Sequence, residues 1–309
     1  MAKVMRNAVM AMKKESVYGT APTIGGANAL LLSALTHTWL AGNTASRDFI
    51  RPFLGNSSTI QLDQHTEFNF EIELQSSGAA GNRPAFADLL MACGFAEDIN
   101  AGTDVVYSPV STDFDSCTAE VNMDGVFQRA TGCRGSFSIN IARGSIPKLP
   151  FNFMGQYSAP SDAAALVADF SGFKDPLGPN SVNTPTVTLF GETLCMESLS
   201  IDIGNNLVYR DLPGCAPSVQ ITQRAVSGTL VFEATDIATK NWIEAARTKE
   251  SGALQIIHGT EAGYIVQIDA PKVTLNPPTN NDSDGVWMYS VPLVFEPDTG
   301  NDEITITFK

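Results

Sequence analysis

The chain has 309 residues, 43% of them hydrophobic and 17% charged, and this composition excludes a largely disordered protein. Its formal net charge of −14 argues against a protein that grips nucleic acid, because such binding needs lysine and arginine to replace the counterions of the phosphates. The length fits two domains of ordinary size. The five cysteines show no C-x-x-C spacing, so we expect reduced thiols.

The first fifty residues are basic and contain many turn-forming residues, and they predict an extended arm that leads into a strand. Its basic residues include Lys3, Arg6, Lys13 and Lys14. Because the rest of the chain is acidic, we expect the arm to dock on a neighbouring subunit, with a disordered terminus as the alternative. Residues 1–16 lack the apolar core of a secretory signal, and no apolar stretch is long enough to span a bilayer. The sequence therefore predicts a soluble protein.

The clearest predicted element is a strand over residues 67–74. Apolar and polar residues alternate along it, and a period of two is typical of a half-buried antiparallel strand. Its polar face carries Glu67, Asn69, Glu71 and Glu73. After a loop rich in small residues we expect a helix that Pro84 opens and Gly94 ends. The buried side chains of this helix are predicted to be Phe86, Leu89, Leu90 and Cys93.

Further strands complete this part of the chain, with Asp124-Gly125 as a strong hairpin turn between two of them. They are predicted at residues 104–107, 118–123, 126–130, 136–141 and 149–153. Residues 159–184 are rich in Ala, Asp, Ser, Pro and Gly, which indicates a linker. We therefore divide the chain into an arm plus first domain (1–158), the linker (159–184) and a second domain (185–309).

The second half repeats this plan. A helix is predicted with Asp236 as its N-cap and with Ile237, Trp242, Ile243 and Ala246 buried. Strands are predicted at residues 186–190, 199–203, 218–222, 229–234, 254–258, 264–268, 273–275, 286–295 and 304–308. Each half is then a sheet covered by one helix, so the fold class is mainly β, with two tandem β-sandwich or barrel domains.

The halves also match in sequence. Arg51-Pro-Phe-Leu-Gly55 and Ile60-Gln-Leu-Asp-Gln64 correspond, at a constant offset, to Arg210-Asp-Leu-Pro-Gly214 and Val219-Gln-Ile-Thr-Gln223. Near the end of each copy, Leu149-Pro-Phe-Asn-Phe153 corresponds to Val291-Pro-Leu-Val-Phe295. Repetition at so long a period indicates two similar domains and not a short-repeat solenoid.

The sequence contains no recognisable catalytic or metal motif. The three histidines, His37, His65 and His258, do not lie at metal-ligand spacing from Cys, Asp or Glu, and no nucleophile elbow or phosphate loop occurs. Residues 280–285 open like a calcium loop, but Val291 stands where a bidentate glutamate is required, so a plain turn is expected. We therefore predict no enzymatic activity, no metal and no cofactor.

Several segments resemble major tail tube proteins of long-tailed bacteriophages. They are Glu15-Ser-Val-Tyr-Gly-Thr-Ala-Pro22 with Asn28-Ala-Leu30, Asp124-Gly-Val-Phe127 with Thr131-Gly-Cys-Arg-Gly135, Asp202-Ile-Gly-Asn205 with Tyr209-Arg-Asp-Leu212, and Gly300-Asn-Asp-Glu-Ile304. The similarity covers essentially the whole chain, and the order and spacing of the segments are more specific than any one of them.

The resemblance implies a structural protein of the virion tail, made in the host cytoplasm. In this family two antiparallel sheets pack around a helix, and six domains close a barrel around a channel. Two domains per chain would give a trimeric ring, and stacked rings would give a tube that conducts DNA. Implied partners are further copies of the chain, the tape measure, terminator and distal tail proteins, and double-stranded DNA that passes without specific binding. Residues 1–26 and 42–58 would reach the next ring.

A channel for DNA favours a wall that does not hold phosphates. Only charges that face the channel act strongly, because the Debye length at physiological salt is about 8 Å. We therefore expect Glu67, Glu71, Glu73 and Glu233 to face the lumen. An ordinary solvated strand face is the alternative interpretation.

Two other functions stay open at this point. Another tail component of the tube fold, such as a terminator or a ring near the spike, would form discrete rings in place of long tubes. A two-domain β-sandwich that binds carbohydrate would present exposed aromatic platforms, whereas Trp39, Trp242 and Trp287 fall at positions predicted to be buried.

Overall fold

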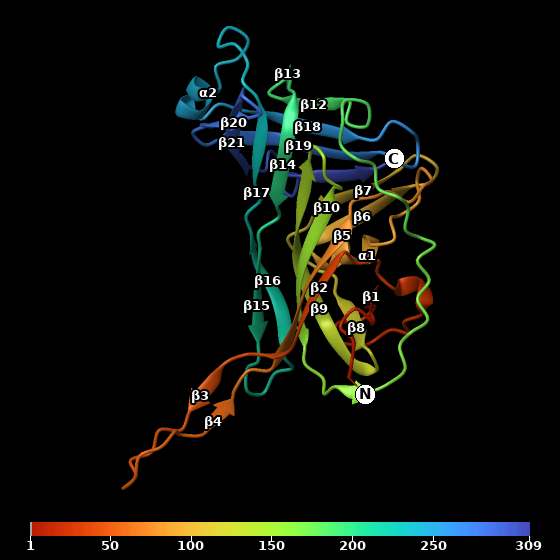
Figure 1. The fold of residues 1–309 in the computed structure, drawn as a ribbon, viewed down its shortest axis with the longest axis vertical. Coiled ribbons are helices and arrows are strands. Elements are labelled where there is room, and N and C mark those ends of the chain that lie inside the picture. The colour runs from red at the N-terminus through yellow and green to blue at the C-terminus, as the bar shows by residue number, and fades with distance from the viewer. Residues whose placement is uncertain (1) are drawn as a thin grey trace.

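The computed structural model describes residues 2–309, and most of its regular structure is antiparallel β-sheet (Figure 1). A long sheet runs through both halves of the chain in the spatial order β2-β5-β10-β9-β14-β17-β21-β20. Its first-half strands are β2 (Ala34–Ala41), β5 (His65–Glu73), β10 (Lys148–Gln156) and the C-terminal part of β9 (Val126–Ala142). Its second-half strands are β14 (Met196–Asp202), β17 (Ser227–Glu233), β21 (Val286–Phe295) and β20 (Thr279–Ser283).

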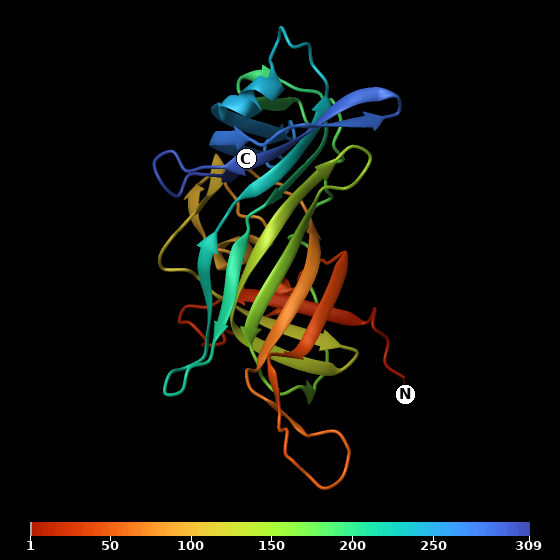
Figure 2. The same ribbon diagram turned by 90° about the vertical axis from the view of Figure 1, so that its left-hand side faces the viewer.

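Two further groups of strands enclose the core together with the long sheet (Figure 2). The first group is β1 (Ala8–Lys14), β8 (Cys117–Met123), the N-terminal part of β9 and β11 (Ser161–Asp162). The second is β13 (Glu192–Thr193), β12 (Thr186–Leu189), β18 (Ser251–His258), β19 (Val266–Leu275) and β22 (Thr305–Phe308), extended by β7 (Asp104–Pro109) and β6 (Phe95–Asn100). Because β7 of the first half pairs with β22 of the second, the two halves interlock.

The core is one continuous cluster that includes side chains from both halves. Alternation along the strands explains it: in β5, Phe68, Phe70 and Ile72 are buried while Asn69 between them is exposed. At the boundary between halves, the Phe308 ring meets Tyr107 edge-on, with 5.7 Å between ring centroids. The mainly β fold predicted from the sequence is confirmed.

Two α-helices lie in the described part of the chain, α1 (Ala87–Ala92) and α2 (Trp242–Thr248), with a short 3-10 turn η1 (Gly26–Asn28). For α1 the four expected side chains are buried and Gly94 follows the helix at a φ of 85°, as predicted, but the helix begins at Ala87 and not at Pro84. The prediction for α2 is partly wrong. Its N-cap is Asn241, whose side chain accepts from the Glu244 N–H at 3.0 Å, and Asp236 precedes the helix. Ile243 is more than half exposed because the helix buries the side of Trp242 and Ala246, and Ile237, which is also more than half exposed, precedes the helix.

Some predicted strands merge and others were not foreseen. Residues 126–130 and 136–141 belong to the single strand β9. The predicted strands 264–268 and 273–275 merge into β19, which begins at Val266. The predicted hairpin turn between β8 and β9 is confirmed, with φ of 49° at Asp124 and 90° at Gly125. The prediction of an N-terminal arm is wrong in part, because Ala8–Lys14 forms β1 and pairs with β8 along its whole length.

Two hairpins extend from the long sheet. β3 (Thr44–Ser46) and β4 (Thr59–Gln61) continue β2 and β5, whereas β15 (Asn205–Arg210) and β16 (Ser218–Arg224) continue β14 and β17. The register pairs Ser46 with Thr59 and Arg210 with Ser218. Arg210 therefore corresponds structurally to Ser46 and not to Arg51, and the tip of the first hairpin, residues 47–58, is longer than that of the second, residues 211–217.

The segment from 163 to 185 contains no helix or strand and runs along the outside of the molecule between the halves (Figure 1). It is fixed by scattered contacts, such as the Asp169 N–H donating to Gly26 O at 3.0 Å. At its end, His258 on β18 is within hydrogen-bonding distance of Thr184 Oγ1 at 2.8 Å and of Leu177 O at 3.0 Å.

Candidate assembly surfaces

One face of the long sheet carries mainly short polar side chains and acids, while the other packs on the core. Because residues paired across antiparallel strands point to the same side, the register decides which side chains share this polar face. From β5 to β17 it comprises Glu67, Asn69, Glu71, Glu73, Asn152, Ser138, Asn140, Ser200, Asp202, Thr229 and Glu233. Of the bases on these strands, Lys148 pairs with an acid, and the Arg134 guanidinium bonds to the β15–β16 hairpin. The face is therefore polar with an excess of negative charge.

The four predicted lumen acids all lie on this face, but they differ in pairing. Lys148 Nζ lies 2.7 Å from Glu71 Oε2, and this bond holds the pKa of Glu71 below its usual value. His65 Nε2 lies 3.2 Å from Glu67 Oε1. Glu73 and Glu233 make no ion pair with the described residues. An exposed pair adds little stability, but Lys148 cancels the charge of Glu71 on this face.

The two halves are joined by main-chain pairing between β9 and β14. The register runs from Ser138 opposite Asp202 to Ala142 opposite Ser198. Beneath this junction Ile139 and Ile201 are buried. Within residues 2–309 the ends of the long sheet are unpaired on one side, because β2 pairs only with β5 and β20 only with β21. Free strand edges are sites where another strand can add.

The free strand β2 has the same place in the first half that β14 has in the second. Each begins a hairpin with the next strand of the long sheet, β5 or β17. The free strand at the opposite end, β20, likewise corresponds to the end of β9. β9 pairs with β10, which contains Pro150, and β20 pairs with β21, which contains Pro292, the match of Pro150 in the sequence repeat. The long sheet thus contains one half-to-half junction and, among the described residues, the two unpaired strands of a second.

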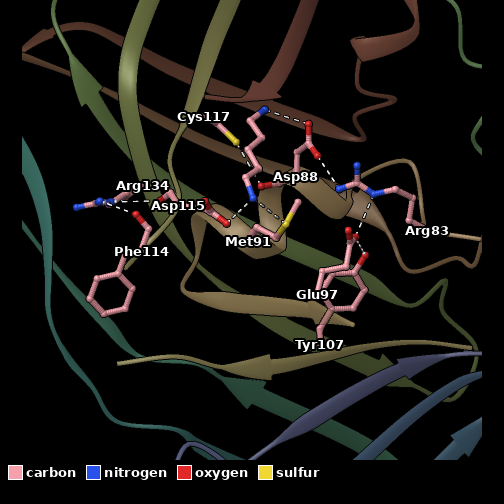
Figure 3. Close-up of polar contacts among 10 residues, drawn as sticks. Arg83, Asp88, Met91, Glu97, Tyr107, Phe114, Asp115, Cys117 and Arg134 are labelled. Atoms are coloured by element: carbon pink, nitrogen blue, oxygen red, sulfur yellow. Dashed lines mark hydrogen bonds and ion pairs between the residues drawn. The ribbon is translucent and has the colours of Figure 1, made fainter. Parts of the chain in front are cut away.

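The β15–β16 hairpin lies against the first half of its own chain. Val219 O accepts from Arg134 Nη1 at 2.8 Å, and the Val219 N–H donates to Tyr18 Oη at 2.7 Å. Arg134 also donates to Phe114 O and, like Lys14 on β1, is held near Asp115 (Figure 3). Val219 and Ile221 are 0% and 8% exposed. Further along, Tyr209 packs on His65, with 5.1 Å between ring centroids.

The β3–β4 hairpin projects away from the body of the molecule (Figure 1). Ile60 and Leu62, which match Val219 and Ile221 in sequence, are 47% and 57% exposed. The tip carries more exposed apolar side chains, Phe49, Ile50, Phe53 and Leu54. Exposed apolar side chains gathered on one element are typical of an interaction surface.

The basic residues of the predicted arm are largely engaged within the chain. Lys14 Nζ lies 2.7 Å from Asp115 Oδ2, and Lys13 Nζ donates to Thr23 O at 3.0 Å. Lys3 Nζ donates to Asp124 O at 2.8 Å, at the β8–β9 turn. Arg6 makes no ion pair with any described residue. A role for these residues between rings stays a prediction.

Across residues 2–309 no group of three His, Cys, Asp or Glu side chains is arranged to hold a metal ion. Cys93, Cys117 and Cys133 are buried, and burial raises their thiol pKa values, which makes them poor nucleophiles. Among the helices of this same part of the chain, none has the length and apolarity needed to cross a membrane.

A family profile described as phage tail tube protein matches residues 5–307. The chain belongs to the phage tail tube protein family. No individual curated protein matches it. The match confirms the resemblance found in the sequence and identifies a structural component of the phage tail, in a family that assembles with itself and with other tail proteins.

For this tail tube protein, sequence reasoning missed Asp202 on the polar face. Asp202 lies opposite Ser138 at the junction of the halves and is exposed. The alternation of Ser198, Ser200 and Asp202 with buried Leu199 and Ile201 could have placed it there.

The predicted burial of the tryptophans is wrong for Trp287. Its indole is about half exposed at the β20–β21 turn, and Nε1–H donates to Asn280 Oδ1 at 3.2 Å. Trp242 is buried as expected, and Trp39 is partly exposed. A strand next to a tight turn leaves one of its faces without a neighbour, so alternation there does not imply burial.

Proposed function

We propose that three copies of this tail tube protein form a ring and that stacked rings form the tube that conducts DNA. The observation that carries the proposal is the β9–β14 junction, in which the outer strand of the first half's part of the long sheet pairs with the outer strand of the second half's part. The free strands β20 and β2 offer the corresponding pairing between chains. Six units per ring, which the family resemblance implies, correspond to three chains. The proposed units are residues 1–158 and 185–309, joined by 159–184.

The junction between chains should be weaker than the one inside the chain. Pro277 and Pro278 interrupt the edge between β19 and β20, at the level of Ile139 of β9, because Thr279 pairs with Ser290 as Asn140 pairs with the matched Lys148. Proline has no N–H to donate to a neighbouring strand. Such residues also protect a free edge from pairing with wrong partners. A weaker junction fits a subunit that stays soluble until it is assembled.

The polar face is the proposed wall of the bore. DNA carries about one negative charge per 1.7 Å of helix axis, so a wall rich in lysine and arginine would hold it at many points. A wall of Glu67, Glu73, Asp202, Glu233 and neighbouring serine, threonine and asparagine side chains offers few such contacts. We further propose that residues 1–26 and 42–58 contact the next ring, where the apolar tip of the β3–β4 hairpin would be covered.

Negative-stain microscopy of the purified protein at high concentration tests the assembly. We expect tubes whose ring averages have three-fold symmetry with six similar lobes. Six complete chains per ring, or a stable monomer at every concentration including in the presence of preformed tail tips, would overturn the trimer. Discrete single rings would favour another tail component of the same fold.

The bore can be tested by reversing its charge. Tubes that carry Glu67→Lys, Asp202→Lys and Glu233→Lys should retain short duplex DNA in a form protected from nuclease, and high salt should release it. Wild-type tubes should retain none. Asp98→Lys, Asp236→Lys and Glu261→Lys make the same charge change at exposed positions off the polar face, so DNA bound there should be digested. Equal protection in both variants would contradict the assignment of the bore.

A further inference from the structure

We infer that the base of the β3–β4 hairpin docks on the second half of the neighbouring chain in the ring. It would do so as β15–β16 docks on the first half within a chain. This inference rests on the proposed ring and adds a second contact to it, made by side chains beside the paired strands. The partner is a second copy of this chain, and the docking segment is residues 58–62.

The observed seat of β15–β16 supplies the reference geometry. The hairpin crosses the middle of β9 and the ends of β10 and β5, where it meets Arg134, Gln156 and His65 in turn. Gln156 Nε2 donates to Pro217 O at the hairpin tip. Ile221 lies next to Gly94, at the end of α1: a Cβ added there would lie 3.6 Å from Ile221 Cδ1. These contacts bury the apolar side of β16.

The second half has a corresponding but open seat. Matching Pro150 to Pro292, as the sequence repeat requires, places Asp298 at the position of Gln156. The strand pairings likewise place Arg224 at the position of His65, since Asn205 pairs with Arg224 as Ala41 pairs with His65. A groove of about 710 Å³ lies there. Its lining includes Arg224, Val226, Val294, Phe295, Pro297 and Glu303.

The groove fits an apolar strand better than a charged one. Val226 and Phe295 form buried parts of its lining, and Val294 and Pro297 are exposed. Its two charged residues neutralise each other, because Arg224 Nε lies 2.5 Å from Glu303 Oε1 and both side chains are nearly buried. Lys272 lies beside the groove and corresponds to Arg134 of the first half. The residues that follow them, Val273 and Gly135, pair with Phe295 and Phe153, which match each other in the sequence repeat. A cation is thus retained that can donate to a strand carbonyl.

The hairpin that fits this groove cannot come from the same chain. Its two extended hairpins are β3–β4 and β15–β16, and β15–β16 is already seated on the first half. The hairpin of each chain that is not seated is β3–β4. Its Ile60 and Leu62 are exposed, although the residues that match them in the repeat, Val219 and Ile221, are buried. The pairing of β2 with β20 of a neighbour would bring that hairpin to the groove, because β3 continues β2 as β15 continues β14. One copy of the chain therefore supplies both the apolar strand and the groove that lacks one.

Disulfide or short bis-maleimide cross-linking in assembled tubes tests the contact. Ser58 and Asp298 correspond to Pro217 and Gln156, so we expect Ser58→Cys with Asp298→Cys to link neighbouring chains into covalent trimers. The background should be Cys195→Ser and Cys215→Ser, because these two cysteines are exposed and the other three are buried. Pro217→Cys with Gln156→Cys is the matched control and should link within one chain only.

The outcomes separate this inference from the proposed ring. Covalent trimers in tubes, absent from dilute monomer, support the docking. Trimeric tubes without cross-linking of the Ser58–Asp298 pair, while the control pair reacts, would overturn the docking and leave the ring intact. Failure of the unsubstituted protein to form rings would overturn the proposed function itself. Links between rings, seen as ladders beyond three chains, would place the hairpin base on the next ring and also overturn the docking.

Discussion

The two hairpins of the long sheet have related sequences and opposite surroundings. On β16, Val219 and Ile221 are buried against the first half of the chain. On β4, Ile60 and Leu62 occupy the matching positions and are exposed. Both strands alternate apolar and polar residues, so alternation does not decide which one is buried. Strand pairing decides it: β14, which leads into β15–β16, pairs with β9 of the first half, whereas β2, which leads into β3–β4, pairs only with β5 among the described residues.

The comparison teaches that an intramolecular contact in a duplicated chain can serve as a template for an intermolecular one. Side chains that maintain the fold in one copy would maintain the assembly in the other. Substitutions at matched positions should therefore separate folding from assembly.

The largest effect is expected for Val219→Asp. It places a charge without a partner at a fully buried site, and we expect unfolding of the monomer to become easier by about 4 kcal/mol. Ile60→Asp, at the matched exposed site, should change the stability of the monomer by less than about 0.5 kcal/mol. Urea denaturation of dilute protein measures both. Similar losses at the two positions would show that β4 is already packed in the monomer.

A large effect on assembly is expected for Ile60→Asp combined with Leu62→Asp. If both side chains become buried between chains, losing each forfeits about 1.5 kcal/mol or more, which raises the concentration needed for tube formation at least about a hundredfold. Thr59→Asp adds a charge on the other face of the same strand and serves as the control. Light scattering against protein concentration gives the threshold. Equal thresholds for the double variant and the control would break the comparison.

Much of the fold could be predicted from the sequence, and the failures have a common cause. Alternation located β5 and its polar face, and helix signals located α1, in which every residue except Asp88 is buried. β1 was missed because Met10, Ala11 and Met12 are buried consecutively under several elements, which leaves no period of two. The edge strands β3 and β20 are short and exposed, so they carry little pattern. What a free edge or hairpin binds depends on other chains, and no local pattern encodes it.

A moderate, pH-dependent effect is expected at His37 on the free strand β2. The position that corresponds to His37 in the second half is Ile203, directly after the end of β14. The unpaired strand β2 therefore carries an ionisable side chain where the paired strand β14 is followed by an apolar one. Burial lowers the pKa of His37 to about 4 from the ordinary 6.5. Below pH 6.5 the unfolded chain takes up a proton that the folded chain refuses, so stability falls with falling pH until about pH 4.

The wild-type monomer should therefore lose about 1–2 kcal/mol between pH 7 and pH 5 through His37, allowing for partial exposure of the ring. His37→Ile should flatten this slope without removing it, because burial also lowers the pKa of His258. Urea titrations at both pH values give the difference. The same slope in wild type and variant would show that His37 titrates normally.

The smallest effect is expected at Lys272, the counterpart of Arg134. Arg134 donates to Val219 O, Phe114 O and Asp115 O, so its loss would leave carbonyl groups of a seated hairpin without partners. Among residues 2–309 the ion-pair partner of Lys272 is Glu296, 3.3 Å away, in a pair that is more than a third exposed. Lys272→Met should therefore change the unfolding free energy of the monomer by less than about 0.5 kcal/mol. If the neighbouring hairpin does seat beside it, the same substitution should still raise the assembly threshold severalfold. A threshold that does not move, together with an unchanged monomer, would mean that the second half holds its incoming strand through apolar contacts alone.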